Sequence, residues 1–244
     1  MSELLQSVKE NSAYVCGFIA IVAAIFVLAI VLEKLAQKKN SKNEKLLSTR
    51  RIVMIGMFSA VAGVLMLLEF ELPIVPNFYK LDFSELPVLI CGFAFGPSAA
   101  VLTEFIKILV KLMFKPTTTA FVGELANFAV GCALVLPATT IYSFKKTKAG
   151  ALIAMITGIC VMVVFGSFFN AVYLLPVFAK MFGGMPVEEL VKMYAEINPA
   201  VSGGSVTSFV IVFTAPLNII KGGADALITM LTYKKLSPLL KGNH

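Results

Sequence analysis

The feature that most constrains this chain is a series of apolar runs, several of them long enough to cross a lipid bilayer. The first run, from Ala13 to Leu32, and the last, from about Val206 to Leu231, are each close to the roughly 20 residues that a helix needs to span the hydrocarbon core. Hydrophobic residues make up 58% of the 244 residues, and the mean hydropathy is +0.89. Soluble domains do not reach such values. We therefore predict an all-α polytopic membrane protein.

Seven apolar segments follow one another, which predicts one extra N-terminal transmembrane helix followed by a six-helix core. Their approximate ranges are 13–32, 52–68, 84–95, 98–114, 123–142, 149–178 and 206–231. The third is too short to span the bilayer upright. Residues 33–51 are basic and rich in Asn and Ser, and they predict a flexible linker. The expected domains are residues 1–49, the extra helix with its cytoplasmic linker, and residues 50–244, the six-helix domain.

The basic residues predict how the chain is oriented in the membrane. Cytoplasmic loops carry an excess of Lys and Arg. Thirteen of the 21 basic residues fall in three segments that alternate helices would place on one side of the membrane: Lys34, Lys38, Lys39, Lys42, Lys45, Arg50 and Arg51; Lys145, Lys146 and Lys148; Lys234, Lys235 and Lys241. The other side receives Lys9, Lys80, Lys115, Lys180 and Lys192. We expect an outside N-terminus, a cytoplasmic C-terminus and contact with membrane lipid but not with nucleic acid.

The residue inventory argues against an enzyme. The one histidine is His244, and the four cysteines lie in apolar runs without a CxxC pair, as small buried hydrophobes do. We find no paired-carboxylate metal motif and no nucleophile beside a plausible base, so an intramembrane transferase is disfavoured and no metal or other cofactor is expected. The chain also lacks a Walker A motif, so it cannot hydrolyse ATP by that route itself.

Polar residues within the apolar runs are the candidate functional groups. Asn218, Lys221 and Asp225 share one face of the last predicted helix, just after Pro216, which is expected to kink it. A lysine at membrane depth is costly, so it should face a partner, a cavity or a ligand. An alternative is that Lys221 only pairs with Asp225 inside the bundle.

Further polar residues lie in three other apolar runs. Glu104, Lys107 and Lys111 form one charged stripe, in which Glu104 and Lys107 can pair, and Glu124 and Asn127 share a face of the following helix. Asn170 lies among aromatic residues, namely Phe165, Phe168, Phe169 and Tyr173. That asparagine could recognise a planar polar ligand or simply bond a neighbouring helix. Residues 69–83 form an aromatic loop with two prolines, which predicts a lid over the bundle.

Four motifs in register resemble one known family. They are Leu81-Asp82-Phe83-Ser84-Glu85-Leu86-Pro87, Gly92-Phe93-Ala94-Phe95-Gly96-Pro97, Thr117-Thr118-Thr119-Ala120 with Gly123-Glu124-Leu125-Ala126-Asn127-Phe128, and Pro216-Leu217-Asn218-Ile219-Ile220-Lys221-Gly222. Together they resemble the riboflavin-specific substrate-binding subunits (S components) of energy-coupling factor (ECF) transporters. The likeness covers about residues 50–238.

The resemblance implies a six-helix S component that binds riboflavin from outside and docks on a transmembrane coupling subunit with two cytoplasmic ATPases. Gly56 and Ala60 match the small residues that face the coupling subunit. Asn170, Asn218 and Lys221 match residues that hydrogen-bond the isoalloxazine edge, and residues 69–83 match a capping loop. The remaining candidates for the substrate site are Lys80, Leu81, Asp82, Thr117, Thr118, Glu124, Asn127 and Asp225, of which the Lys80–Asp82 and Thr117–Thr119 loops suit the ribityl chain.

Two alternatives remain open at this stage. The cargo could be FMN or another vitamin, although a phosphate would need a basic cluster near the outer loops, where Lys80 and Lys115 are the obvious candidates. The chain could also be a structural membrane subunit without a transport role. Polar residues in four separate apolar runs argue against that, because each is costly without a partner.

Overall fold

Helices build almost all of the protein, as expected for apolar segments whose backbone groups find no water in a bilayer. The computed structural model describes residues 12–41, 45–46, 48–73, 75–76, 78–181, 183–196, 198, 200–201 and 205–241. Its elements are α2 (Ser12–Lys39), α3 (Thr49–Leu67), β1 (Phe70–Glu71), β2 (Lys80–Leu81), α4 (Glu85–Phe95), α5 (Pro97–Phe114), α6 (Val122–Phe144), α7 (Lys148–Phe169), η1 (Asn170–Leu174), α8 (Leu175–Met181), α9 (Val187–Ala195), α10 (Val206–Phe209), η2 (Val210–Thr214) and α11 (Ala215–Lys241).

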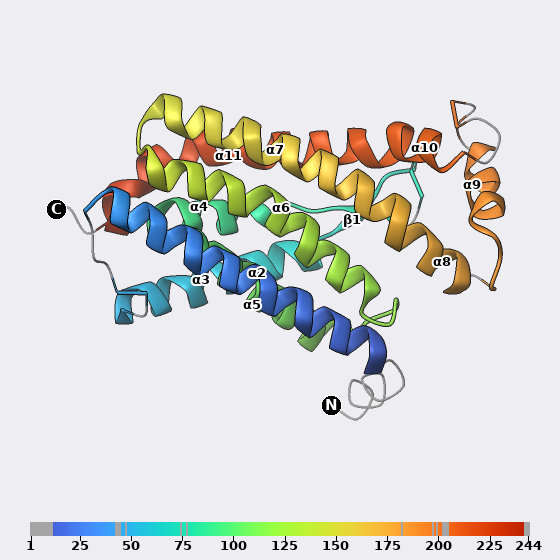
Figure 1. Ribbon diagram of the computed structural model, residues 1–244, viewed down its shortest axis with the longest axis horizontal. Coiled ribbons are helices and arrows are strands. Elements are labelled where there is room, and N and C mark those ends of the chain that lie inside the picture. Colours follow the sequence, from blue (N-terminus) through green and yellow to red (C-terminus); the bar gives the residue numbers. More distant parts are fainter. Residues whose placement is uncertain are drawn as a thin grey trace.

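The long helices run along one common direction, and the loops between them gather at the two ends of the molecule (Figure 1). Helix α4 is short and contacts α3, α5, α6 and α11, so it lies at the centre of the bundle. Val88, Leu89 and Cys91 on this helix are completely buried. A segment too short to span the membrane upright is therefore kept inside the protein.

The predicted fold class is confirmed. Within the described part of the chain, five helical stretches are long and apolar enough to cross a membrane: Ile19–Lys39, Thr49–Leu67, Val122–Phe144, Lys148–Met181 and Val206–Leu236. The central α4 and the charged α5 complete a six-helix core, to which α2 is added. Helix α2 packs on α5 and α6, where its Val22 and Ala29 are buried.

The linker that we predicted over residues 33–51 is shorter than expected, because residues 33–39 and 49–51 are helical. Helix α2 continues to Lys39 and α3 begins at Thr49, so the connection is short. Arg51 and Glu33 are buried and form a bidentate ion pair, with Nη1–Oε1 at 2.6 Å and Nη2–Oε2 at 3.0 Å. Arg51 also donates to Ser98 Oγ at 2.6 Å, which fixes α2 and α3 to the start of α5. The composition of the segment could not reveal this long-range pairing. Lys42 lies outside the described residues, as do the first eleven residues.

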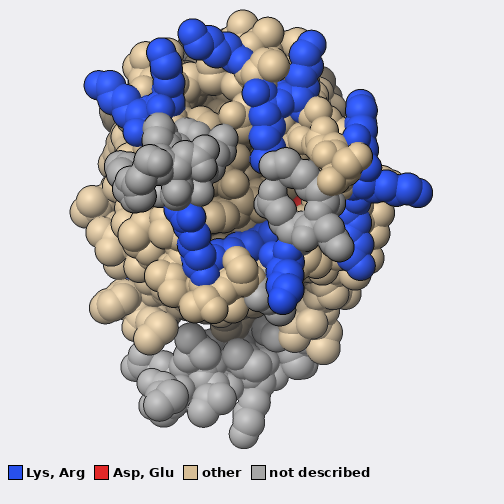
Figure 2. Space-filling view, turned by 90° about the vertical axis from the view of Figure 1, so that its left-hand side faces the viewer, with Lys and Arg blue, Asp and Glu red and all other residues tan. Residues whose placement is uncertain are grey.

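Exposed lysines and arginines concentrate at one end of the bundle, where α2 ends, α3 begins and α6 turns into α7 (Figure 2). The exposed residues there include Lys38, Lys39, Arg50, Lys145 and Lys148. The aromatic loop, α9 and the start of α10 lie at the opposite end (Figure 1). The loop that we predicted as irregular contains a two-stranded antiparallel pair, in which Phe70 faces Leu81 and Glu71 faces Lys80.

Two turns of π-helix interrupt the long C-terminal helices near the loop end. η1 ends two residues before Pro176, and η2 ends two residues before Pro216. Proline lacks the N–H that would bond the carbonyl four residues earlier, and its ring displaces that carbonyl. The wider turn absorbs this disruption and changes the direction of nearby side chains. The predicted disturbance at Pro216 is thus a π-turn, which carries Thr214 into the site described next.

Candidate ligand-binding site

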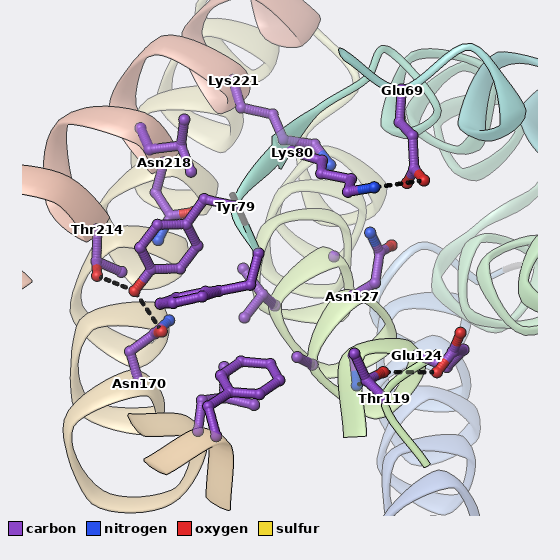
Figure 3. Close-up of a pocket in the computed structure, with 18 of the residues that line it drawn as sticks. Glu69, Tyr79, Lys80, Thr119, Glu124, Asn127, Asn170, Thr214, Asn218 and Lys221 are labelled. Carbon is purple, nitrogen blue, oxygen red and sulfur yellow. Dashed lines mark hydrogen bonds and ion pairs between the residues drawn. The ribbon is translucent and has the colours of Figure 1, made fainter. Parts of the chain in front are cut away.

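A cavity of about 470 Å³ opens among the helices beneath the aromatic loop. Its volume is within the range of small-molecule sites. The lining comes from the 69–83 loop, α4, the end of α5, the start of α6, the η1 and η2 turns, α9 and α11. Elements far apart in sequence therefore converge on one space, with polar groups on several of its sides (Figure 3).

The loop residue Tyr79 forms one polar wall. Its hydroxyl donates to Asn170 Oδ1 at 2.6 Å, and it lies 2.7 Å from Thr214 Oγ1. Because a phenol has one proton, Thr214 must donate to Tyr79. Asn170 also donates from Nδ2 to the carbonyl of Gly166 at 3.0 Å. The loop is thereby joined to both π-turns (Figure 3).

Amide groups on two helices offer further hydrogen bonds to the cavity. Asn218 is buried and lines it from α11, and Asn127 lines it from α6. The Oδ1 atom of Asn127 is buried without a hydrogen-bond partner in the part of the chain that the structure describes. Buried polar atoms are almost always bonded in proteins. The amide of Asn127 therefore retains unused hydrogen-bonding capacity at the wall of the cavity.

A charged cluster forms the deep side of the site. Lys221 Nζ lies 3.0 Å from Asp82 Oδ2 and 3.0 Å from Glu85 Oε2. A lysine has three donors, so one remains for a group in the cavity. The predicted pairing of Lys221 with Asp225 is not found in the described chain, and both oxygens of Asp225 lack a hydrogen-bond partner there. Lys221 therefore pairs with Asp82, which is far away in the sequence, and not with Asp225 on the same helix. Helical spacing alone could not show this partner.

The charged stripe on α5 is mostly structural. Lys107 is completely buried and contacts Glu104 Oε1 at 2.6 Å, Ser84 Oγ at 2.8 Å and Glu85 Oε1 at 3.0 Å, which confirms the predicted Glu104–Lys107 pair. Its ammonium donates hydrogen bonds to Ser84 and Glu85, and the nearby Glu104 carboxylate compensates its charge. Glu85 forms ion pairs with both Lys107 and Lys221, so it connects the stripe to the cavity wall.

Three lysines surround Glu69 at the rim of the cavity. Glu69 lies 2.6 Å from Lys115, 3.4 Å from Lys80 and 3.6 Å from Lys111. Burial raises the pKa of Glu69, but the hydrogen bond from Lys115 and the charges of Lys111 and Lys80 outweigh it and hold that pKa below its usual value. Lys80 also contacts the exposed Glu71 at 3.2 Å.

Aromatic side chains supply apolar walls, though not the ones that we expected around Asn170. Phe78, Phe178 and Tyr194 line the cavity, with the rings of Phe78 and Phe178 4.9 Å apart. Phe165, Phe169 and Tyr173 stack on one another outside the lining, and Phe168 is 64% exposed.

The structure brings most of the predicted site residues together. Seven line the cavity: Lys80, Thr118, Glu124, Asn127, Asn170, Asn218 and Lys221. Four lie outside its lining: Leu81, Asp82, Thr117 and Asp225. Asp82 accepts a hydrogen bond from Lys221, and Thr117 donates one to Glu124 at 2.9 Å. Which of them touch a ligand stays a prediction.

Several lining residues were not among the predicted substrate-site residues: Glu69, Tyr79, Glu85, Lys111, Lys115, Tyr194 and Thr214. Among the described residues, no group of three or more His, Cys, Asp or Glu side chains is arranged to hold a metal ion.

Comparison with known proteins accounts for this architecture. The family model for the substrate-specific component of ECF transporters matches residues 50–233. The chain belongs to the family of ECF transporter substrate-specific components. The match includes every residue that lines the cavity, whereas α2 lies before it.

Relatives of this substrate-specific component carry transporter names. The riboflavin transporter RibU of Staphylococcus aureus (strain TCH60) is 31% identical over 192 residues, which cover 79% of this chain and 93% of the relative. The riboflavin transporter FmnP of Bacillus subtilis (strain 168) is 27% identical over 196 residues, which cover 80% of this chain and 96% of the relative. A solved structure of the S component of a bacterial ECF transporter superposes with a TM-score of 0.59 at 32% identity, and the match covers 78% of this chain and 97% of the other. The protein is thus the substrate-binding subunit of an ECF-type importer.

Proposed function

We propose that the protein binds riboflavin in this cavity, from the outside, and delivers it inward with a separate energising module. The observation that carries the proposal is the set of polar groups that face the cavity between aromatic walls, with Asn127 Oδ1 still lacking a partner among the described residues. The riboflavin transporters among the relatives support the choice of cargo.

The chemistry of these groups suits a flavin. The pyrimidine edge of isoalloxazine alternates carbonyl acceptors with an N–H donor. Asn218 offers both a donor and an acceptor, and Lys221 offers its remaining donor. Phe78 and Phe178 provide apolar surface for the ring system. The ribityl hydroxyls then extend toward the loop end, where Thr118 and Lys80 line the cavity.

The exposed face of α3 supports docking to a coupling subunit. Gly56 and Ala60 are exposed one helical turn apart, a spacing that allows close helix approach. We propose that they contact a transmembrane coupling subunit that works with two cytoplasmic ATPases. The basic end of the bundle (Figure 2) would face the cytoplasm, which puts the aromatic loop and the N-terminus outside.

Replacing Asn218 by alanine should weaken riboflavin binding by roughly 5- to 100-fold, which corresponds to about 1–3 kcal/mol for lost hydrogen bonds in a buried site. The measurement is quenching of riboflavin fluorescence on titration with detergent-purified protein. The matched control is Asn40→Ala, because Asn40 is exposed and donates to the Ser143 carbonyl at the basic end, away from the cavity. Wild-type affinity in a folded Asn218→Ala protein would remove Asn218 from the site.

A further inference from the structure

Glu69 lies at the rim of the cavity beside three lysines. Its side chain is only 7% exposed, and three ammonium groups approach it within 3.6 Å. Lys80 is on β2, Lys111 is in the last turn of α5, and Lys115 directly follows that helix. Figure 3 shows Lys80 extending toward Glu69 at the edge of the cavity. All four residues line the cavity.

Lysine ammonium groups are common phosphate ligands in proteins, where they act as point charges. Here a carboxylate of the protein itself takes the place of the phosphate oxygens. It uses lysine donors that an incoming anion would need, and its negative charge repels that anion. The lowered pKa of Glu69 keeps the carboxylate ionised at neutral pH.

We propose that Glu69 is a specificity-determining residue that excludes flavins phosphorylated on the ribityl chain, such as FMN, and so reserves the cavity for the uncharged vitamin. This inference rests on the proposed function, because it places the ribityl end of riboflavin at the loop side of the cavity. The ring edge then lies toward Asn218 and Lys221, and the terminal hydroxyl lies near Lys80, Thr118 and Lys115. A 5′-phosphate would meet the Glu69 carboxylate there.

The test compares riboflavin with FMN in the Glu69→Gln variant, which removes the charge and keeps the shape. Without the charge of Glu69, the three lysines become available to the phosphate, so FMN affinity relative to riboflavin should rise by about tenfold or more. Riboflavin affinity itself should change by less than about threefold. Both are measured by flavin fluorescence quenching on purified protein.

Glu71→Gln is the matched control. Glu71 contacts Lys80 at 3.2 Å, but its side chain is 56% exposed and it does not line the cavity. The ratio of the two affinities should stay at the wild-type value in this variant. The double variant Glu69→Gln/Lys115→Gln should lose most of the gain in FMN affinity, because Lys115 makes the shortest contact with Glu69.

An unchanged affinity ratio in Glu69→Gln, or equal weakening of both flavins, would overturn the proposal, since a structural role for Glu69 affects both ligands alike. Failure of the wild-type protein to bind riboflavin would instead defeat the proposed function, and this inference with it. A second measurement needs no variant. Riboflavin 5′-acetate, which is uncharged, should bind the wild-type protein at least about tenfold more tightly than FMN. If FMN and riboflavin 5′-acetate both bound more weakly than riboflavin, and by the same factor, the size of the 5′ substituent and not its charge would determine affinity. That result would also overturn the proposal.

Discussion

Replacing Lys221 by methionine should lower the free energy of unfolding by about 3–5 kcal/mol, which is the usual cost of removing one partner from a buried ion pair. Lys221 lies within 3.0 Å of Asp82 and of Glu85, and the side chains of both acids are only 1% exposed. The only other lysine within ion-pair distance of either acid in the described chain is Lys107, which already serves Glu85 and Glu104. Denaturant titration of the protein in detergent would measure the loss.

Two further variants separate lost charge from lost packing. Lys192→Met makes the same change on the exposed side of α9 and should alter stability by less than about 0.5 kcal/mol. Asp82→Asn, added to Lys221→Met, should restore part of the stability, because it removes the carboxylate that is left without a lysine, whereas Glu85 keeps Lys107. A Lys221→Met protein as stable as the wild type would show that the buried charges are compensated in another way. Since Lys221 supports the fold in this account, Asn218 is the cleaner probe of binding.

Replacing Gly56 by leucine should abolish vitamin uptake and leave riboflavin affinity unchanged. Apart from its two chain neighbours and its own helix backbone, no atom lies within 4 Å of the position that a Cβ on Gly56 would take, so the larger side chain should not disturb the bundle. It would instead separate α3 from the coupling subunit, because close helix contact in membranes depends on small residues. Vesicles that contain the protein and its energising module would measure vitamin uptake. Titration of the purified protein with riboflavin would measure affinity.

Gly17→Leu is the control for this change, since Gly17 is exposed on α2 and also has open space around it. Normal uptake by the Gly56→Leu protein would place the coupling subunit on another face. Loss of riboflavin binding in that protein would mean that Gly56 packs within the chain.

Local sequence patterns were sufficient to predict the helices of this protein. The lengths of the apolar runs and the positions of the prolines predicted the six-helix core and the short segment that forms α4. The extent of α2 was underestimated, because Lys34 and Lys38 resemble linker residues until Glu33 is seen to pair with Arg51. The sequence of the aromatic loop has no alternation of apolar and polar residues that would predict its strand pair.

The residue pattern alone predicted the site where a polar residue interrupts an apolar helix, whereas the loop residues Lys80 and Thr118 were expected from the family resemblance. Asn170, Asn218 and Lys221 stand out in this way, and all three line the cavity. Tyr79 and Glu69 belong to a loop in which tyrosine and glutamate are ordinary, and their roles depend on partners from other helices. Such long-range contacts determine which charged groups are paired and which polar groups lie at the rim of the cavity. A single sequence does not show these contacts.

The most direct test of the central claim is whether the detergent-purified protein carries a flavin. We predict a flavin absorbance band in near-stoichiometric amount, with riboflavin identified by mass spectrometry of the released ligand. A colourless preparation that also fails to quench the fluorescence of added riboflavin would contradict the account.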